Sequence, residues 1–174
     1  LRHAINTFNT AASNLRYIPG HVSFDEGGVM CKSRFCPVRQ YNKDKPDKFR
    51  VDFFIMACPS SFFIHHLDVY QGKNASNVGI KQEARCLPTT QKAVLNAILF
   101  TRIGNDPDGS RMLAMDNRYN CPELGTLMRG RYGILCAGTT RANRKGWPKE
   151  DMDLKMKSNG SNRGMYKMVV DKTN

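Results

Sequence analysis

The sequence predicts an α/β domain in which a mixed sheet is flanked by helices. Strand-like and helix-like segments follow one another in the order strand, strand, strand, helix, strand, helix, strand, an alternation typical of a mixed sheet with helices on its faces. Hydrophobic residues make up 40% of the 174 residues and aromatic residues 9%, which excludes a wholly disordered chain. A chain of this length forms one domain of ordinary size with at most a small appendage.

The N-terminal part of the chain is expected to form a helix, a short strand and an irregular arm. Residues 3–15 place apolar side chains near helical spacing, which predicts a helix. Residues 22–25 resemble a short strand that ends in carboxylates, and the Gly27-Gly28 pair is expected to break it. Residues 31–48 contain two prolines and many cations, so we expect a loop or an extended arm there.

A hairpin is expected to follow the arm. Residues 50–57 alternate apolar and polar side chains, which is the signal of a half-buried strand. The Pro59-Ser60 turn separates this segment from a second strand-like run over residues 62–70. Strands joined by so short a connection pair in antiparallel fashion, so the two segments predict a hairpin.

The strongest helix signal in the chain covers residues 89–103. Four of its side chains fall on one stripe, namely Val94, Ala97, Ile98 and Thr101, and an apolar stripe predicts the face that packs on a core. Gly104 follows directly and is expected to end the helix, because glycine is common just past a helix C-terminus.

Strand and helix signals continue after this helix. Residues 112–115 are a brief apolar strand, and residues 132–138 form an apolar run typical of a buried parallel strand. Between them, Asn120 is expected to cap a second helix that has Pro122 in its first turn and Glu123 at its third position. Farther on, polarity rises, with a loose linker expected over residues 149–163 and one more strand over residues 165–170.

The net charge favours nucleic acid as the partner. The chain has 27 Lys and Arg against 15 Asp and Glu, which gives a formal charge of +12, and such an excess attracts polyanions. The cations gather in two runs with aromatic residues among them, over residues 31–50 and 124–149. Aromatic side chains among cations suit DNA contact better than solubility alone, although a solvated basic surface is the simpler alternative. No stretch approaches 18 apolar residues, so no membrane partner is expected.

The six cysteines are expected to be reduced thiols. They form no C-x-x-C pair, which argues against a structural zinc site. Most lie in apolar or strand-like surroundings, where a reduced cysteine acts as a small core residue. The alternative is a secreted cationic protein with three disulfides, in which no free thiol would titrate.

Two aspartates stand at the ends of predicted strands. Asp25 closes the first strand, over residues 22–25, and Asp116 follows the fourth, over residues 112–115. Carboxylates at adjacent strand ends suit hard divalent cations, which take oxygen ligands and leave positions open for phosphates. On spacing alone, however, an aspartate at a strand end more often caps a turn.

Two blocks of the sequence resemble the PiggyBac-type transposases. The first is VSFDE at residues 22–26, followed by RFCPVRQYNKDKPDKF at residues 34–49. The second is MDNRY at residues 115–119, followed by GTTRANRKGWP at residues 138–148. The resemblance extends over most of residues 20–171, and the two blocks stand in the order that the family has.

The resemblance implies an RNase H-like fold in which the first and fourth strands are neighbours, so that Asp25 and Asp116 share a metal site. These two would be the first members of an acidic triad that cleaves and transfers DNA strands with Mg²⁺ or Mn²⁺ as cofactor. Glu26 and Asn117 are adjacent candidates for supporting the site. Eight basic residues would hold the DNA: Arg34, Arg39, Lys43, Lys45, Lys48, Arg141, Arg144 and Lys145. A nuclear location is implied as well, and a homodimer is compatible with the longer parent protein.

The resemblance also divides the chain. Residues 1–138 would be a catalytic-core fragment with an N-terminal helix, and residues 139–174 a basic segment with the start of an insertion subdomain. The family's third acid lies farther downstream, and Asp171 falls where the insertion would start. The fold is therefore expected to be incomplete at its C-terminus, and the chain to bind DNA without independent activity. The alternative is a noncatalytic DNA- or protein-interaction module derived from a transposase.

Overall fold

The computed structural model describes residues 2–14, 19–72, 82–84, 87–104, 111–148 and Met168. Their elements are, in order, α1 (Arg2–Ser13), β1 (His21–Met30), β2 (Arg39–Tyr41), β3 (Phe49–Ala57), β4 (Ile64–Val69), a 3₁₀ turn η1 (Gln82–Ala84), α2 (Thr89–Thr101), β5 (Met112–Met115), α3 (Pro122–Tyr132) and β6 (Leu135–Gly138).

The six strands form one mixed sheet. Its order is β2-β3-β1-β5-β6, and β4 also pairs with β3. The pairs that β3 makes with β1, β2 and β4 are antiparallel, whereas β1 pairs with β5, and β5 with β6, in parallel. The predicted mixed sheet, the 50–57/62–70 hairpin and the parallel strand after the second helix are all confirmed.

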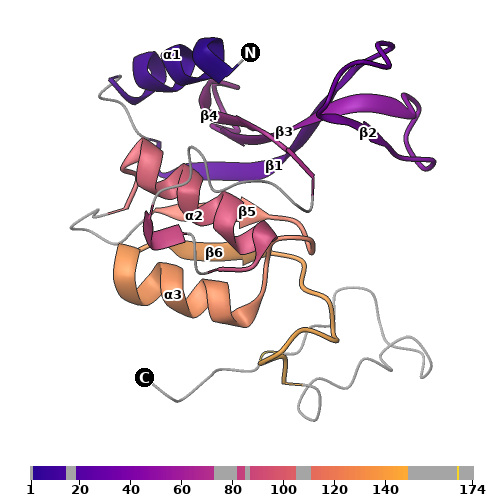
Figure 1. Cartoon of the computed structure of the whole chain (residues 1–174). Coiled ribbons are helices and arrows are strands. Elements are labelled where there is room, and N and C mark those ends of the chain that lie inside the picture. The colour runs from indigo at the N-terminus through magenta and orange to yellow at the C-terminus, as the bar shows by residue number, and fades with distance from the viewer. Residues whose placement is uncertain are drawn as a thin grey trace.

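The core lies between this sheet and the helices. Phe24 of β1 and Leu113 of β5 are almost wholly buried and join one apolar cluster with Ile98 of α2 and Leu124 and Met128 of α3. Figure 1 shows α2 and α3 against the part of the sheet that β1, β5 and β6 form, with α1 beside β4. The apolar stripe predicted for the helix over residues 89–103 is buried as expected.

The helix α1 protects the backbone of β4. The Asn9 side chain is buried, and its Nδ2 donates to the carbonyl oxygen of Leu67 at 2.8 Å while its Oδ1 accepts the Leu67 N–H at 2.9 Å. One amide therefore pairs both backbone groups of a residue in this strand, which would otherwise be left unpartnered.

The Gly27-Gly28 pair does not end the first strand, and the expectation that it would is wrong. The strand β1 continues to Met30, and the two glycines pair with β3. A Cβ at Gly27 would lie 2.5 Å from Cδ1 of Ile55, and a Cβ at Gly28 would lie 2.1 Å from the Arg50 guanidinium carbon. The glycines leave room for the ends of two β3 side chains, which cross over the β1 backbone at these positions.

Three helix and strand ends also differ from the expectations. The N-cap of α3 is Cys121, in an extended conformation and without a side-chain cap bond, so Asn120 is not the cap. The strand predicted from residue 132 begins only at Leu135, because α3 continues to Tyr132 and ends at Gly133 with φ 68°. The helix α2 ends at Thr101, with Arg102 in the left-handed region (φ 54°), and not at Gly104.

The segment expected to be an irregular arm contains the short strand β2, which pairs with β3. We call residues 28–50 the arm: they comprise the outer end of β1, β2, the start of β3 and the connecting loops. Figure 1 shows the arm projecting from the sheet, away from the helices.

The C-terminal part of the chain is only partly covered. The linker predicted over residues 149–163 lies outside the described residues, as does the strand predicted over residues 165–170 apart from Met168, which is in no strand. The division at residue 138 stays a prediction. Among the described residues, no helix is long and apolar enough to cross a membrane, and Cys31, Cys36, Cys58, Cys121 and Cys136 are free thiols.

Candidate functional site

The structure brings Asp25 and Asp116 together. The parallel pairing of β1 with β5 ends at Phe24 and Met115, and the next residue on each strand is one of the two aspartates. Neighbouring strands lie about 4.8 Å apart, so two carboxylates far apart in sequence stand side by side. Both residues are exposed. Their role as metal ligands stays a prediction.

Backbone groups hold one oxygen of each carboxylate. The Glu26 N–H donates to Oδ1 of Asp25 at 2.8 Å, and the Arg118 N–H donates to Oδ1 of Asp116 at 2.8 Å. These short-range bonds are the Asx-type contacts that aspartate makes at turns. They fix the direction of each carboxylate without closing it off from solvent.

Neighbouring carboxylates act electrostatically on Asp25. Contact with the surrounding protein raises the pKa of the Asp25 carboxyl above its usual range, and the negative charges of Glu26 and Asp116 add to this rise. A negative charge close by disfavours ionisation of the Asp25 carboxyl. A cation beside the pair would relieve that repulsion.

Glu26 links the two strand ends that carry the aspartates. Its carboxylate is ion-paired with Arg118, and its Oε2 accepts a hydrogen bond from the Tyr119 hydroxyl at 2.6 Å. Burial alone would raise the pKa of Glu26, but the Tyr119 hydrogen bond and the Arg118 charge hold it below its usual range. Since Arg118 and Tyr119 belong to the loop after β5, Glu26 ties β1 to that loop.

The basic segment after β6 is bound to the same loop. Arg141 Nε donates to Oδ1 of Asn117 at 3.1 Å, and Arg144 donates to the carbonyl oxygens of Asn117 (3.2 Å) and Arg118 (2.8 Å). Lys145 pairs with Glu123 at 3.3 Å, but its side chain is 89% exposed. Arg141 and Arg144 are thus bound to Asn117 and Arg118, the two residues that follow Asp116.

Gly138 controls how closely β6 approaches the site. Its φ is 147°, and a Cβ there would lie 1.8 Å from the carbonyl oxygen of Met115. This contact is backbone against backbone, so no side-chain rotation can relieve it. Gly138 pairs with Met115, the residue before Asp116. Only glycine fits there, because the φ angle is unfavourable for other residues and the two backbones are in contact.

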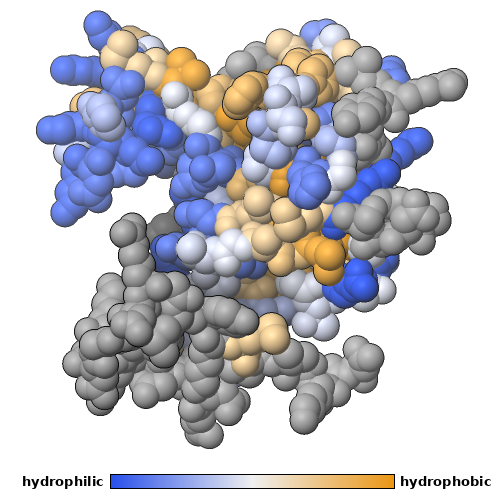
Figure 2. All heavy atoms as spheres, turned by 180° about the vertical axis from the view of Figure 1, so that it is seen from behind, coloured by the Kyte–Doolittle hydropathy of each residue, from blue (hydrophilic) through white to orange (hydrophobic). Residues whose placement is uncertain are grey.

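The other five predicted DNA-binding residues lie on the arm, apart from the carboxylates. They are Arg34, Arg39, Lys43, Lys45 and Lys48. Asp25 pairs with Ile55, and the six residues from there to Phe49 span roughly 20 Å along β3. No ion pair joins any of the five to another described residue. Figure 2 shows the hydrophilic side chains that gather on this part of the molecule.

Arg118 and Tyr119 were not singled out in the sequence, although the pattern contained a signal for them. Glu26 stands two residues after Phe24, so both face the same side of β1, and Phe24 is 1% exposed. An acid on the buried side of a strand requires a cation or a hydroxyl partner. The adjacent Arg118-Tyr119 pair supplies both.

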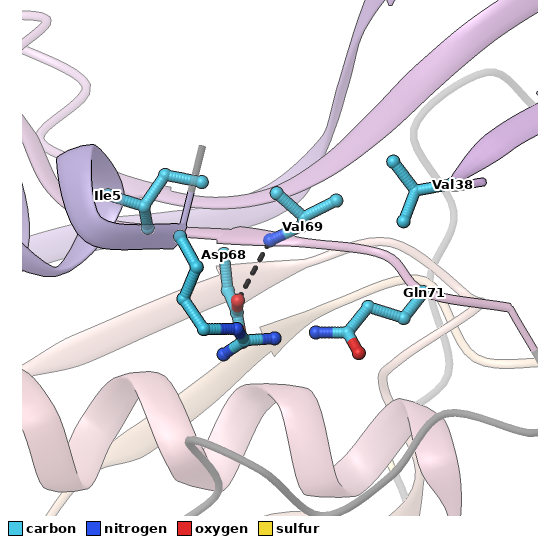
Figure 3. Close-up of a pocket in the computed structure, with 6 residues that line it drawn as sticks. Ile5, Val38, Asp68, Val69 and Gln71 are labelled. Carbon is cyan, nitrogen blue, oxygen red and sulfur yellow. Dashed lines mark hydrogen bonds between the residues drawn. The ribbon is translucent and has the colours of Figure 1, made fainter. Parts of the chain in front are cut away.

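A small cavity elsewhere is not part of this site. It has a volume of about 240 Å³ and lies where α1 meets β4, with Ile5, Asp68, Val69 and Gln71 in its lining. Figure 3 shows the Val69 N–H donating to Asp68 within it, a bond of 2.8 Å. None of the predicted site residues lines it.

The donor set at the strand ends fits a hard cation. Two exposed carboxylates supply only oxygen atoms, which Mg²⁺ prefers, and Mg²⁺ commonly keeps several waters beside one or two carboxylates. Within the described ranges, no group of three or more His, Cys, Asp or Glu side chains is placed to hold a metal ion.

Together, the mixed sheet, with β1, β5 and β6 parallel at one side, and the helices that cover it define an RNase H-like fold. The family described as Transposase IS4 matches residues 1–172, and the chain belongs to that family.

A solved structure, that of a piggyBac transposase in a synaptic complex with hairpin DNA, is similar to this chain with a TM-score of 0.71 and 19% sequence identity. The similarity covers 93% of this chain and 30% of that one, so the chain spans less than a third of the transposase. It shows that this chain has the fold of the matching part of that transposase. A search of curated proteins gave no match.

Proposed function

We propose that this piggyBac-like domain binds DNA and retains, in Asp25 and Asp116, a divalent-metal site derived from a DNA strand cleavage and transfer centre. The observation that carries the proposal is the parallel register of β1 and β5, which ends one residue before each aspartate. The two carboxylates would hold Mg²⁺ or Mn²⁺.

A divalent cation between carboxylates stabilises charge on a phosphate and lowers the pKa of a bound water. The residues around the pair have supporting roles. Glu26 and Arg118 fix the loop that carries Asp116, and Arg141 and Arg144 place positive charge on that same loop, where a DNA phosphate would approach. Strand transfer in this class needs an acidic triad, so we propose that the 174 residues bind DNA and metal without cleaving DNA by themselves.

The DNA contact is proposed to be electrostatic and only weakly sequence-selective. The chain has a net charge of +12, and five arm cations have no acidic partner among the described residues. Cations of this kind contact phosphates, which carry no sequence information. A DNA-binding protein of a transposable element acts on chromosomes, so we also propose a nuclear location.

Calorimetry with Mn²⁺ tests the metal site. The intact chain is expected to release or absorb heat on binding, and Asp25→Asn and Asp116→Asn are each expected to abolish that signal. Asp44→Asn, which removes an exposed acid on the arm, is the matched control and should leave the signal unchanged. An intact chain that gives no signal would instead favour the noncatalytic interaction module.

A salt titration tests the DNA contact independently of the metal. Affinity for duplex DNA, measured by filter binding, is expected to fall steeply between low and high salt, because each phosphate contact releases counterions. Affinity that does not change with salt would contradict an electrostatic contact.

A further inference from the structure

We propose that the outer end of the arm binds unpaired DNA bases, which stack on its exposed aromatic side chains while its cations contact the phosphates. The inference rests on the proposed DNA binding and specifies that this surface binds DNA with unpaired bases. It concerns a surface apart from the two carboxylates.

The first observation is the exposure of three aromatic rings. Phe35 is 96% exposed, Tyr41 62% and Phe49 46%, whereas Phe24 and Tyr119 in the core are each 1% exposed. A scattered surface phenylalanine is ordinary, but a group of exposed rings on one projecting element marks a site of interaction. The rings are therefore available to a partner.

The second observation is that two of the rings are in contact, with their planes tilted by 51°. Tyr41 and Phe49 are directly opposite each other on β2 and β3, with ring centroids 5.1 Å apart. The Arg39 guanidinium carbon lies 4.7 Å from the Phe49 centroid, which is the geometry of a cation–π contact. Rings and a guanidinium plane are the groups on which bases stack.

The third observation is the charge around these two rings. A groove of about 480 Å³ is lined by Phe49 together with Arg34, Arg39 and Lys48, and Asp47 is the only acid among the described residues that line it. Cations that track a backbone beside aromatic faces are the pattern of proteins that bind single strands. In a duplex the base faces are covered by neighbouring bases, so stacking on these rings requires unpaired nucleotides.

Backbone hydrogen bonds hold the strands of the arm together where Tyr41 and Phe49 lie. Pairing between β1 and β3 continues to Met30 and Arg50. Beyond it, the Cys31 N–H donates to the Phe49 carbonyl at 2.9 Å, and the Asn42 N–H donates to the Lys48 carbonyl at 2.8 Å. A platform that is already ordered loses little conformational entropy on binding.

The test compares a single-stranded oligonucleotide of about 20 nucleotides with the duplex of the same sequence, by fluorescence anisotropy with the intact chain. Phe35→Ala and Tyr41→Ala are each expected to weaken single-strand binding about fivefold or more and to change duplex binding less than about twofold. The matched control is Phe62→Ala, which removes an 82% exposed ring from the turn at the opposite end of β3. It should change neither affinity.

A fluorescent adenine analogue in the single strand reports stacking directly. Its emission is expected to be quenched by the intact chain and by Phe62→Ala, and to recover in Tyr41→Ala. The stacking proposal would be overturned if the arm variants lost affinity equally for single strand and duplex, or if both kept their single-strand affinity. Salt-dependent duplex binding would still support the proposed function in either case. Failure of both the single strand and the duplex to bind at low salt would overturn the stacking proposal and the proposed function together.

Discussion

The arm and the rest of the described chain, which we call the body, carry the same types of cation in different situations. In the body, Arg118 is paired with Glu26, and Arg144 donates to two backbone carbonyls. On the arm, Arg34, Lys43 and Lys48 have no ion pair with any described residue.

The difference separates cations that hold the fold from cations that are available to a ligand. A half-buried guanidinium must be paired, because removing its partner leaves an uncompensated charge. An exposed lysine with no partner contributes little to stability and keeps its charge for phosphates. Changes to the paired residues near the carboxylates should therefore alter the free energy of unfolding, and changes to the unpaired cations of the arm should alter binding alone.

The largest effect on the body is expected from Gly138→Ala. The new Cβ would meet the Met115 carbonyl at 1.8 Å in a backbone conformation that alanine rarely adopts, so we expect a loss of about 3 to 5 kcal/mol in the free energy of unfolding. Gly125→Ala is the control, because nothing lies within 4 Å of a Cβ there, in the middle of α3, and helix propensity favours alanine by roughly 1 kcal/mol. Urea denaturation of both variants measures the contrast, and a tolerated Gly138→Ala would refute the close approach of β6.

Acid is expected to weaken the body through His66. Burial lowers the pKa of His66 from 6.5 to about 4, so the native state keeps the ring neutral while the unfolded state takes up a proton below 6.5. The contribution of the neutral His66 to the free energy of unfolding is therefore fully present above pH 6.5. It decreases as pH falls toward 4, by up to about 3 kcal/mol.

Denaturation at several pH values checks this dependence against His66→Leu, which cannot take up the proton. Leucine also removes two ring nitrogens that have no hydrogen-bond partner among the described residues. The variant should lose most of the difference in stability between about pH 7 and about pH 4. If the free energy of unfolding of the variant fell with pH as steeply as that of the unmodified chain, the acid sensitivity would belong to other groups.

A smaller effect is expected from Glu26→Gln. The change removes the charge that pairs with Arg118 and weakens the bond from Tyr119, at a cost of about 1–3 kcal/mol. Glu123→Gln makes the same replacement in the exposed pair with Lys145 and should cost less than about 1 kcal/mol. Equal melting temperatures for the two variants would show that Glu26 does not link β1 to the loop after β5.

Local patterns in the sequence predicted most of the sheet. Alternation identified β3, a turn identified its hairpin with β4, and an apolar run identified β6, because each of these signals lies within a few residues. The juxtaposition of Asp25 and Asp116 also followed, once the resemblance made their strands neighbours. Local patterns did not predict which groups accept hydrogen bonds from Arg118 and Arg144. They also did not predict that β1 continues to Met30.

The features that were missed depend on contacts between distant segments. The glycines at 27 and 28 look like a strand breaker until the side chains of Ile55 and Arg50 are placed over them. The pairing of Glu26 with Arg118 joins residues far apart in the sequence, and the strand β2 forms only because β3 lies beside it. Such contacts follow from the tertiary structure and are invisible to local propensity.

The salt dependence of DNA binding by Lys43→Ala/Lys45→Ala/Lys48→Ala tests the separation of the arm from the body most directly. The three lysines are exposed and have no ion pair within the described chain, so the melting temperature should stay that of the unmodified chain. The slope of log affinity against log salt should become shallower by about 2 to 3, because each phosphate that a lysine no longer reaches reduces the slope by close to one unit. An unchanged slope, or a loss of stability in its place, would show that the arm does not provide the DNA-binding charge.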